Sequence, residues 1–407
     1  MTIRLLLALW FSTGLLSASD WPQIFGPNRN GVYAGQDLAA AWPKEGPRRV
    51  WQVKVGEGFS GPAVAQGKVI VFHRLGDREV VQCLDAKTGN ALWKFDYETK
   101  YRDQFGFDNG PRAVPAIAGG KVYTLGAEGT LSCVNLADGK LQWRVNTKEE
   151  FKAPAGWFGM VCSPLVEGNA VVVNIGGEGA GIVAFHKDTG KVLWKATDDP
   201  ASYSSPIAAT INDRRLLVFF AFNGLLTLEP AGGKVVHSFE WKPPIRESVS
   251  AATPIVVDDL IFISASYNTG AVLLRAKGER VEKVWSGDES MSNHYATCVY
   301  RDGFLYGLDG RHDFAGGTEL RCVEFRTGKV RWSKPGLSAA NVMLAGDQLL
   351  ALTENGELIR VAAQSNAYKE TGRAQILSAG VRAFPALADG RFYARSKNVL
   401  VCINLGQ

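Results

Sequence analysis

The residues best suited to chemistry include two of the chain's five histidines. His294 lies in the segment SNHYAT, and His312 lies in GLDGRHDFAGGTE between Arg311 and Asp313. Two imidazoles and a carboxylate are ligands that zinc accepts, so a close approach of these side chains would create a metal site. The other interpretation is a set of polar loop residues that hydrogen-bond to one another. The sequence leaves both interpretations open.

A second candidate for metal chemistry is a pair of oxygen-bearing side chains in glycine-rich loops. Glu178 stands in NIGGEGAG and Asn223 stands in AFNGL. Carboxylate and carboxamide oxygens are the ligands that calcium prefers, so the pair could hold Ca²⁺. Loops flanked by glycine also form without any ligand, and that alternative stays open.

Two long polar segments, 97–113 and 146–163, carry arginines, aspartates and aromatic side chains but no acid and base at catalytic spacing. Arginine and aromatic residues are enriched at protein interfaces. We therefore expect a binding surface in these segments and assign no catalytic residue. Its candidate members here are Arg102, Asp103, Asp108, Arg112, Trp157 and Phe158.

These segments connect the units of a repeat. One phrase, a strand followed by Thr-Gly or Asp-Gly and a second strand that ends in Trp, recurs about every 40–50 residues, the period of a four-stranded propeller blade. A second phrase of the form P-x-x-x-x-G-x-V-x-V precedes each copy. Clear copies end at Trp93, Trp143, Trp194 and Trp332, and weaker ones end at Phe239, Trp285 and Leu377.

The two ends of the chain predict how the ring closes. The C-terminal segment FPALADGRFYARSKNVLVCINL supplies three strands, and RRVWQVKV around Trp51 resembles the missing outer strand. Closure would remove two exposed sheet edges. We expect an all-β, eight-bladed propeller of four-stranded antiparallel blades with Trp51 beside Cys402. Seven blades remain the alternative if one weak copy is irregular.

Positions within the repeat separate structural from functional residues. Each recurring Trp is expected to pack against the glycine turn of the next blade. Four of the six cysteines occupy equivalent third strands, too far apart to pair, so no disulfide is expected. In a four-stranded blade the loops between second and third strands share one face with the connections between blades. All the candidate site residues above lie in such loops, and His294 and His312 belong to one blade.

The start of the chain has the features of a secretory signal peptide. Residues 1–19 contain Arg4, an apolar stretch too short to span a bilayer, and small residues up to Ser19. We expect cleavage near Ser19, an extended lead-in over 20–49, and one propeller domain over 50–407. The mature protein would be periplasmic or secreted, without a membrane span. A net charge of +5 without a basic stripe argues against nucleic-acid binding.

The phrases A-x-x-G-x-V-Y and L-D-A-x-T-G-x-x-x-W resemble the repeat of the pyrroloquinoline-quinone repeat proteins. This family includes the quinoprotein dehydrogenases and the BamB-type outer-membrane assembly propellers. The resemblance covers residues 51–405, and the segment 20–32 looks like the lead-in of exported BamB-like proteins. The chain departs from both groups. It lacks the adjacent cysteine pair of the dehydrogenases and the lipidated cysteine of enteric BamB-type proteins.

Three functions remain after these observations. The leading expectation is a non-catalytic, monomeric binding or scaffold propeller without a cofactor, which recognises an envelope protein, a peptide or a surface polymer. The alternative implied by the resemblance is an oxidoreductase for alcohols or sugars that uses pyrroloquinoline quinone and Ca²⁺, with Glu178 and Asn223 as calcium ligands. A third is a sugar-processing or lyase activity.

Overall fold

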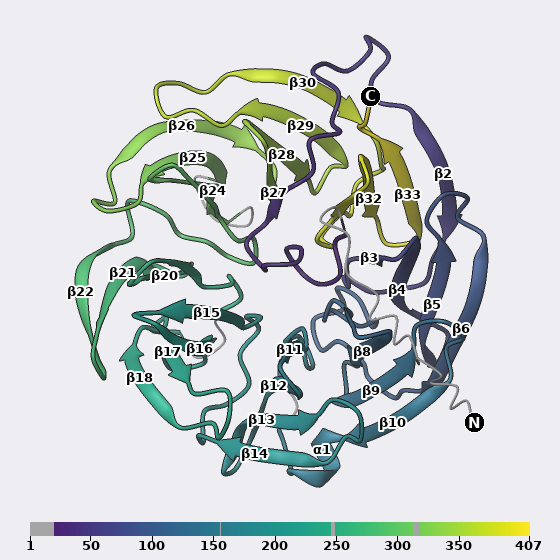
Figure 1. Cartoon of the computed structure of the whole chain (residues 1–407). Coiled ribbons are helices and arrows are strands. Elements are labelled where there is room, and N and C mark those ends of the chain that lie inside the picture. The colour runs from purple at the N-terminus through teal and green to yellow at the C-terminus, as the bar shows by residue number, and fades with distance from the viewer. Residues whose placement is uncertain (1–19, 155, 246–248, 312–316) are drawn as a thin grey trace, which may run out of the picture.

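The computed structural model describes residues 20–407 except 155, 246–248 and 312–316. In this part of the chain, eight small antiparallel sheets stand around one axis (Figure 1). The signal peptide predicted over 1–19 lies outside the described residues. No helix among the described residues is long and apolar enough to cross a membrane.

The strands of each blade follow one another from the axis to the rim. The first blade consists of β3 (Ala63–Ala65), β4 (Lys68–Leu75), β5 (Arg78–Asp85) and β6 (Ala91–Glu98). The second consists of β7 (Ala116–Ala118), β8 (Lys121–Leu125), β9 (Thr130–Asn135) and β10 (Leu141–Asn146), and the short helix α1 (Thr147–Glu150) follows it. The third consists of β11 (Leu165–Glu167), β12 (Ala170–Gly177), β13 (Ala180–His186) and β14 (Val192–Ala196). The fourth consists of β15 (Ile207–Ile211), β16 (Arg214–Ala221), β17 (Gly224–Leu228) and β18 (Val235–Glu240).

The remaining blades repeat this order. The fifth consists of β19 (Ile255–Val257), β20 (Leu260–Ala265), β21 (Gly270–Lys277) and β22 (Arg280–Gly287). The sixth consists of β23 (Val299–Arg301), β24 (Phe304–Gly310), β25 (Thr318–Glu324) and β26 (Val330–Leu337). The seventh consists of β27 (Ala340–Ala345), β28 (Gln348–Thr353), β29 (Glu357–Ala362) and β30 (Glu370–Gln375). The eighth consists of β31 (Ala386–Ala388), β32 (Arg391–Arg395), β33 (Val399–Asn404) and the N-terminal strand β2 (Arg49–Lys54).

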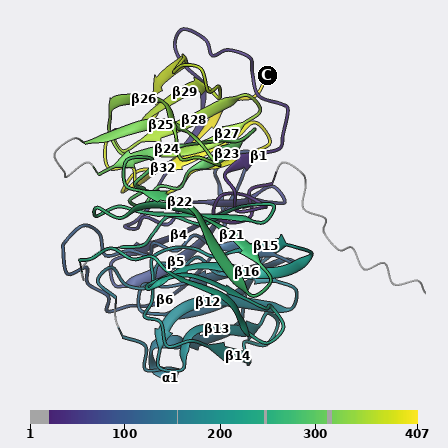
Figure 2. The same cartoon turned by 90° about the vertical axis from the view of Figure 1, so that its left-hand side faces the viewer.

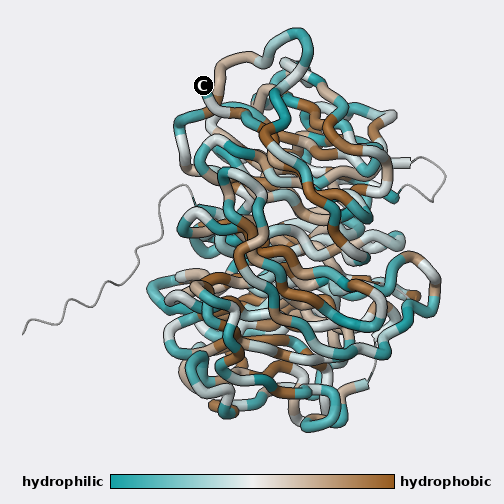
Figure 3. Tube along the Cα trace, turned by 90° about the vertical axis from the view of Figure 1, so that its right-hand side faces the viewer, coloured by the Kyte–Doolittle hydropathy of each residue, from teal (hydrophilic) through white to brown (hydrophobic). Residues whose placement is uncertain are grey.

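The eighth blade closes the ring with strands from both ends of the chain. β2 pairs antiparallel with β33, and Trp51 stands opposite Cys402. The prediction of eight blades and of this pairing is confirmed, and the seven-bladed alternative is wrong. The central strands of each blade are apolar, whereas hydrophilic residues gather in the turns (Figure 3). All six cysteines are buried and free.

The lead-in enters the axis before it reaches the eighth blade. Trp21 exchanges backbone hydrogen bonds of 2.8 Å with Val64 of the first blade. Farther along, β1 (Val32–Tyr33) pairs parallel with β27 of the seventh blade (Figure 1; Figure 2). Between them lies Arg29, which donates to the carbonyl oxygens of Ser163, Pro164 and Pro206. Burial lowers the pKa of Arg29 to about 10. Residues 20–33 therefore fill the centre of the ring.

The repeated tryptophans join neighbouring blades, as the sequence predicts. Trp143 donates its indole N–H to the carbonyl oxygen of Lys187 in the next blade, at 2.9 Å. It also packs on Gly190, where a Cβ atom would lie 2.8 Å from the indole ring and φ is +69°. The same hydrogen bond, at 2.8–3.1 Å, is made by Trp51, Trp93, Trp194, Trp285 and Trp332.

The fourth blade replaces this tryptophan with a histidine. The sequence repeat predicts Phe239 at this position, but the register places His237 there, opposite Thr227. His237 is buried, and its Nε2 lies 3.0 Å from the carbonyl oxygen of Gly278 in the next blade. The prediction of Phe239 is wrong by two residues because His237 makes the inter-blade contact in place of an indole.

The seventh blade lacks this side chain altogether. Gly372 of β30 stands opposite Arg360, at the register position of the other tryptophans. The place of the missing aromatic side chain is taken by Trp42 of the lead-in. Its ring lies 3.0 Å from where a Cβ atom of Gly372 would be. The lead-in thus supplies an aromatic ring to the one blade whose outer strand has none at this position. We call residues 34–48, which cross from the axis to β2, the strap.

Substitutions at Trp42 and Gly372 test whether the strap supplies the aromatic ring that the seventh blade lacks. We expect Trp42→Ala to lower the free energy of unfolding by about 2 kcal/mol, less than the roughly 3–5 kcal/mol of a fully buried Trp, because Trp42 is only partly buried. In that background Gly372→Trp should restore stability, since Gly372 does not have a positive φ. In the unchanged protein Gly372→Trp should destabilise by collision with Trp42. Urea unfolding of the four proteins measures the coupling, and additive effects would contradict the role of Trp42.

Candidate functional site

The candidate site lies on the face formed by the connections between blades and by the loops between second and third strands. We call this the looped face, and the opposite one, with its short first-to-second and third-to-fourth turns, the turn face. The long connections 99–115 and 147–164 belong to the looped face and follow the first and second blades.

A buried ion pair organises the first of these connections. The carboxylate of Asp103 is fully buried and accepts hydrogen bonds of 3.0 Å from the backbone N–H groups of Phe105, Phe107 and Asp108. Arg112 donates to the same carboxylate at 2.9 Å, and its side chain is only 9% exposed. These contacts hold the turn over 103–108 in one conformation. Of the predicted binding residues, Arg112 and Asp108 therefore lie mostly inside the protein.

The same arginine joins the two long connections. Its guanidinium donates to the carbonyl oxygen of Phe158 at 2.9 Å and to the hydroxyl of Tyr101 at 3.1 Å. It also lies over the rings of Phe59 and Phe158, 5.5 and 5.6 Å from their centroids. Such cation–π contacts add to the hydrogen bonds. Arg112 is thus a positioning residue for the aromatic side chains around it.

The aromatic side chains form a continuous surface, which we call the aromatic patch. The rings of Phe105 and Phe158 lie 5.1 Å apart, those of Phe105 and Trp157 lie 6.1 Å apart, and those of Phe158 and Tyr203 lie 5.5 Å apart. Phe105 is 50% exposed and Phe107 is 44% exposed. A cluster of exposed aromatic side chains is a candidate for an interaction site. The patch consists of Phe59, Phe105, Phe107, Trp157, Phe158 and Tyr203.

Basic side chains border this patch. Arg382, from the connection between the seventh and eighth blades, lies over Phe107 at 5.2 Å and over Phe59 at 5.6 Å. It donates to Glu354 at 2.6 Å. Arg102 is exposed and pairs with Asp77 at 3.0 Å. A partner would therefore meet aromatic rings with guanidinium groups at the edge.

Sequence reasoning found part of the patch and missed the rest. The sequence predicts Trp157 and Phe158, and the structure brings Phe158 to Arg112 and Trp157 to Phe105. Phe105 and Phe107 stand in the same predicted connection, where the aromatic spacing was a usable signal. Phe59, Tyr203 and Arg382 come from three other connections. Only the ring topology brings these three to the patch.

The histidine candidate lies at the fifth and sixth blades. The hydroxyl of Tyr267 and Nε2 of His294 lie 3.1 Å apart, and the guanidinium of Arg311 lies 4.2 Å from the centroid of the Tyr267 ring. His312 and Asp313 lie outside the described residues, so the convergence of the two histidines stays a prediction. The described residues contain no group of three His, Cys, Asp or Glu side chains that could hold a metal.

The calcium candidate has a different environment from the one that calcium requires. Asn223 donates to Asp199, and its Oδ1 accepts a hydrogen bond from the ammonium of Lys242 at 3.2 Å. Glu178 is exposed on the neighbouring blade. The ammonium of Lys242 already contacts the oxygen that calcium would need. These residues do not fit a calcium-bound quinone.

Two buried carboxylates, those of Asp309 and Glu79, have raised pKa values, as catalytic acids often do, but their contacts are structural. Burial raises the pKa of Asp309 to about 6, and this carboxylate pairs with Arg321 at 3.0 Å. It accepts a hydrogen bond from the backbone of Ser292 at 2.7 Å. Glu79 likewise accepts from Ala127 of the next blade at 2.9 Å. Each carboxylate fastens one loop to another, so neither indicates an acid–base pair.

Replacement of Arg112 should destabilise the connection that holds the aromatic patch. We expect Arg112→Met to lower the free energy of unfolding by about 3–5 kcal/mol, because it leaves the Asp103 carboxylate buried without its cation. The double variant Asp103→Asn/Arg112→Met should regain part of this loss. Chemical denaturation measures the effect, and the exposed Arg102→Met serves as control with a change of about 0.5 kcal/mol or less. Equal effects of the two arginine variants would contradict the positioning role.

Comparison with known proteins gives two groups of relatives. The outer membrane protein assembly factor BamB of Shewanella oneidensis is 23% identical over 375 residues, which cover 86% of this chain and 87% of that protein. The quinohemoprotein alcohol dehydrogenase ADH-IIG of Pseudomonas putida is 27% identical, over 46% of this chain and only 25% of its own length.

Solved structures show the same fold at lower identity. BamB from Moraxella catarrhalis superposes with a TM-score of 0.63 at 15% identity, over 88% of this chain and 97% of that chain. The quinohemoprotein alcohol dehydrogenase from Comamonas testosteroni superposes with a TM-score of 0.66 at 17% identity, over 96% and 81%. A family model described as outer membrane protein assembly factor BamB matches residues 77–334. This chain therefore belongs to the BamB family of propellers with pyrroloquinoline-quinone-type repeats.

Proposed function

We propose that this protein is an exported, non-catalytic propeller that binds a protein partner through the aromatic patch and takes part in outer-membrane protein assembly. The printed names of its BamB relatives state the assembly role for those proteins. The observation that carries the proposal here is the patch itself, with two phenylalanines about half exposed and held by a buried ion pair. A rigid aromatic surface costs little conformational entropy when it binds.

The expected location follows from the same proposal. The signal peptide is removed near Ser19, and the mature protein works in the periplasm as a monomer without a cofactor. Its partner is an envelope protein that presents apolar side chains to the patch and carboxylates to its rim. A free peptide or a surface polymer is the other kind of ligand that the exposed loops could take.

Site-specific photo-crosslinking tests the location of the interface. We expect benzoyl-phenylalanine at position 105 to crosslink one envelope protein in intact cells, and the same group at position 141 to give no adduct. Leu141 is a matched control because it is 44% exposed on the outer strand β10, away from the patch. Phe107→Ala should reduce the adduct at position 105 by about tenfold, the loss expected of an aromatic hot spot. Equal adducts at both positions, or none at position 105, would overturn the proposal.

The oxidoreductase alternative predicts a different response. A quinone site would stabilise the protein by about 2.7 kcal/mol when pyrroloquinoline quinone and Ca²⁺ are present at a hundredfold excess over Kd. We expect no change in melting temperature and no dye-linked oxidation of alcohols, because Lys242 occupies the carboxamide oxygen that calcium would need. A shift that Glu178→Gln removes would establish the oxidoreductase function instead.

A further inference from the structure

The junction of the seventh and eighth blades departs from the repeat at two opposed positions. Elsewhere the third strand carries a small or apolar residue opposite the aromatic side chain of the outer strand. These residues are Cys83, Cys133, Ala184, Thr227, Leu273, Cys322 and Cys402. In the seventh blade this position is Arg360, and its partner is Gly372. Paired departures from a repeated pattern are where specialised sites are expected.

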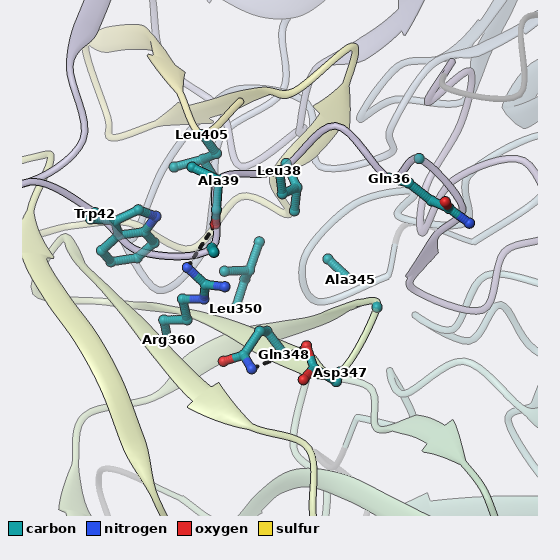
Figure 4. A pocket seen from close by; sticks show the side chains of 13 residues that line it. Gln36, Leu38, Ala39, Trp42, Ala345, Asp347, Gln348, Leu350, Arg360 and Leu405 are labelled. Atoms are coloured by element: carbon teal, nitrogen blue, oxygen red, sulfur yellow. Dashed lines mark hydrogen bonds between the residues drawn. The ribbon is translucent and has the colours of Figure 1, made fainter. Parts of the chain in front are cut away.

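A cavity of about 360 Å³ lies at this junction on the turn face (Figure 4). The strap forms one side with Leu38 and Trp42, and the seventh blade forms the other with Leu350. Leu405, which follows the last strand, completes the apolar wall. Ligand sites in proteins begin at about this volume. The cavity is therefore large enough for a small ligand and is built mainly from apolar side chains.

Arg360 gives this apolar cavity a positive charge. Arg360 is only 9% exposed, and its Nη1 donates to the carbonyl oxygen of Ala39 at 3.0 Å. Figure 4 shows the rest of the guanidinium directed toward the cavity beside Leu350. No carboxylate within the described ranges forms an ion pair with it. Burial lowers the pKa of Arg360, and the charge of the nearby Asp347 carboxylate opposes this effect.

Other polar groups of the lining are already engaged. The side-chain amide of Gln348 donates to Asp347 at 3.1 Å, and its carbonyl oxygen accepts from Thr371 at 2.8 Å. Asp347 thus hydrogen-bonds to an amide and not to the guanidinium, although its charge raises the pKa of Arg360. A guanidinium has five N–H donors in a planar fork that matches a carboxylate. An anionic group next to an apolar body would therefore complement the guanidinium and the apolar wall of this cavity.

We propose that this cavity binds a small amphiphilic monocarboxylate of the fatty-acid type. Its carboxylate would receive hydrogen bonds from Arg360, and its alkyl chain would lie along Trp42, Leu38 and Leu350. Each buried methylene strengthens binding by about fourfold, so affinity rises with chain length until the cavity is full. The site lies on the turn face and does not involve the aromatic patch, so it is independent of the proposed function.

Titration calorimetry with octanoate, below the concentration at which it forms micelles, tests the proposal. We expect saturable binding of octanoate at one site and at least about tenfold weaker binding of octanol, because the alcohol cannot pair with the guanidinium. Arg360→Met keeps the apolar stem and should remove this preference. The exposed Arg102→Met is the matched control and should bind octanoate as the unchanged protein does.

A second variant protects the test against misfolding. Leu38→Trp fills the cavity from the strap and leaves Arg360 in place, so it should abolish octanoate binding without loss of the folded state in circular dichroism. Equal binding of octanoate and octanol, no saturable binding, or unchanged binding by Arg360→Met would each overturn the proposal. Binding of a short apolar peptide through its C-terminal carboxylate, with no binding of octanoate, would overturn the fatty-acid-type ligand.

Discussion

The pairing of β2 with β33 is the contact on which the rest of the structure depends. A ring of sheets that stays open leaves the faces of two blades without neighbours and exposes their apolar side chains. Closure by the two ends of the chain gives every blade two neighbours and brings separate connections to one face. The aromatic patch exists only in the closed ring, because its members come from connections that are far apart in the sequence.

One departure from the repeat lies in the fourth blade, and a larger one lies in the seventh blade, beside the blade that closes the ring. Most blades meet through an indole that donates to the next blade, and the fourth achieves the same contact with His237. The seventh blade has neither, because its outer strand carries Gly372. Trp42 fills that place from outside the blade, and Arg360, which stands opposite Gly372, donates to the carbonyl oxygen of Ala39 in the strap. The proposed ligand cavity thus lies next to the blade that closes the ring.

Much of the fold could be predicted from spacing alone. The period, the eight blades and the position of Trp51 follow from a repeat whose strands and turns have clear local signals. The register of the weak copies could not be predicted, because His237 can replace an indole by hydrogen bonding without resembling it in the sequence. Of the patch, Trp157 and Phe158 were found from composition, whereas Tyr203 and Arg382 reach it only through the ring. The contact of Trp42 with Gly372 joins segments about 330 residues apart, beyond any local pattern.

The axial position of residues 20–33 has a consequence for how the protein is made. The ribosome synthesises these residues before any blade, yet their hydrogen-bond partners include Ser163, Pro206 and, through β1, the seventh blade. Arg29, β1 and β2 must therefore wait for partners that are translated much later. Part of a segment that is synthesised early therefore gains its native contacts only after later blades have been made. A chain that ended before β33 would contain the first seven blades but would lack the strand that pairs with β2.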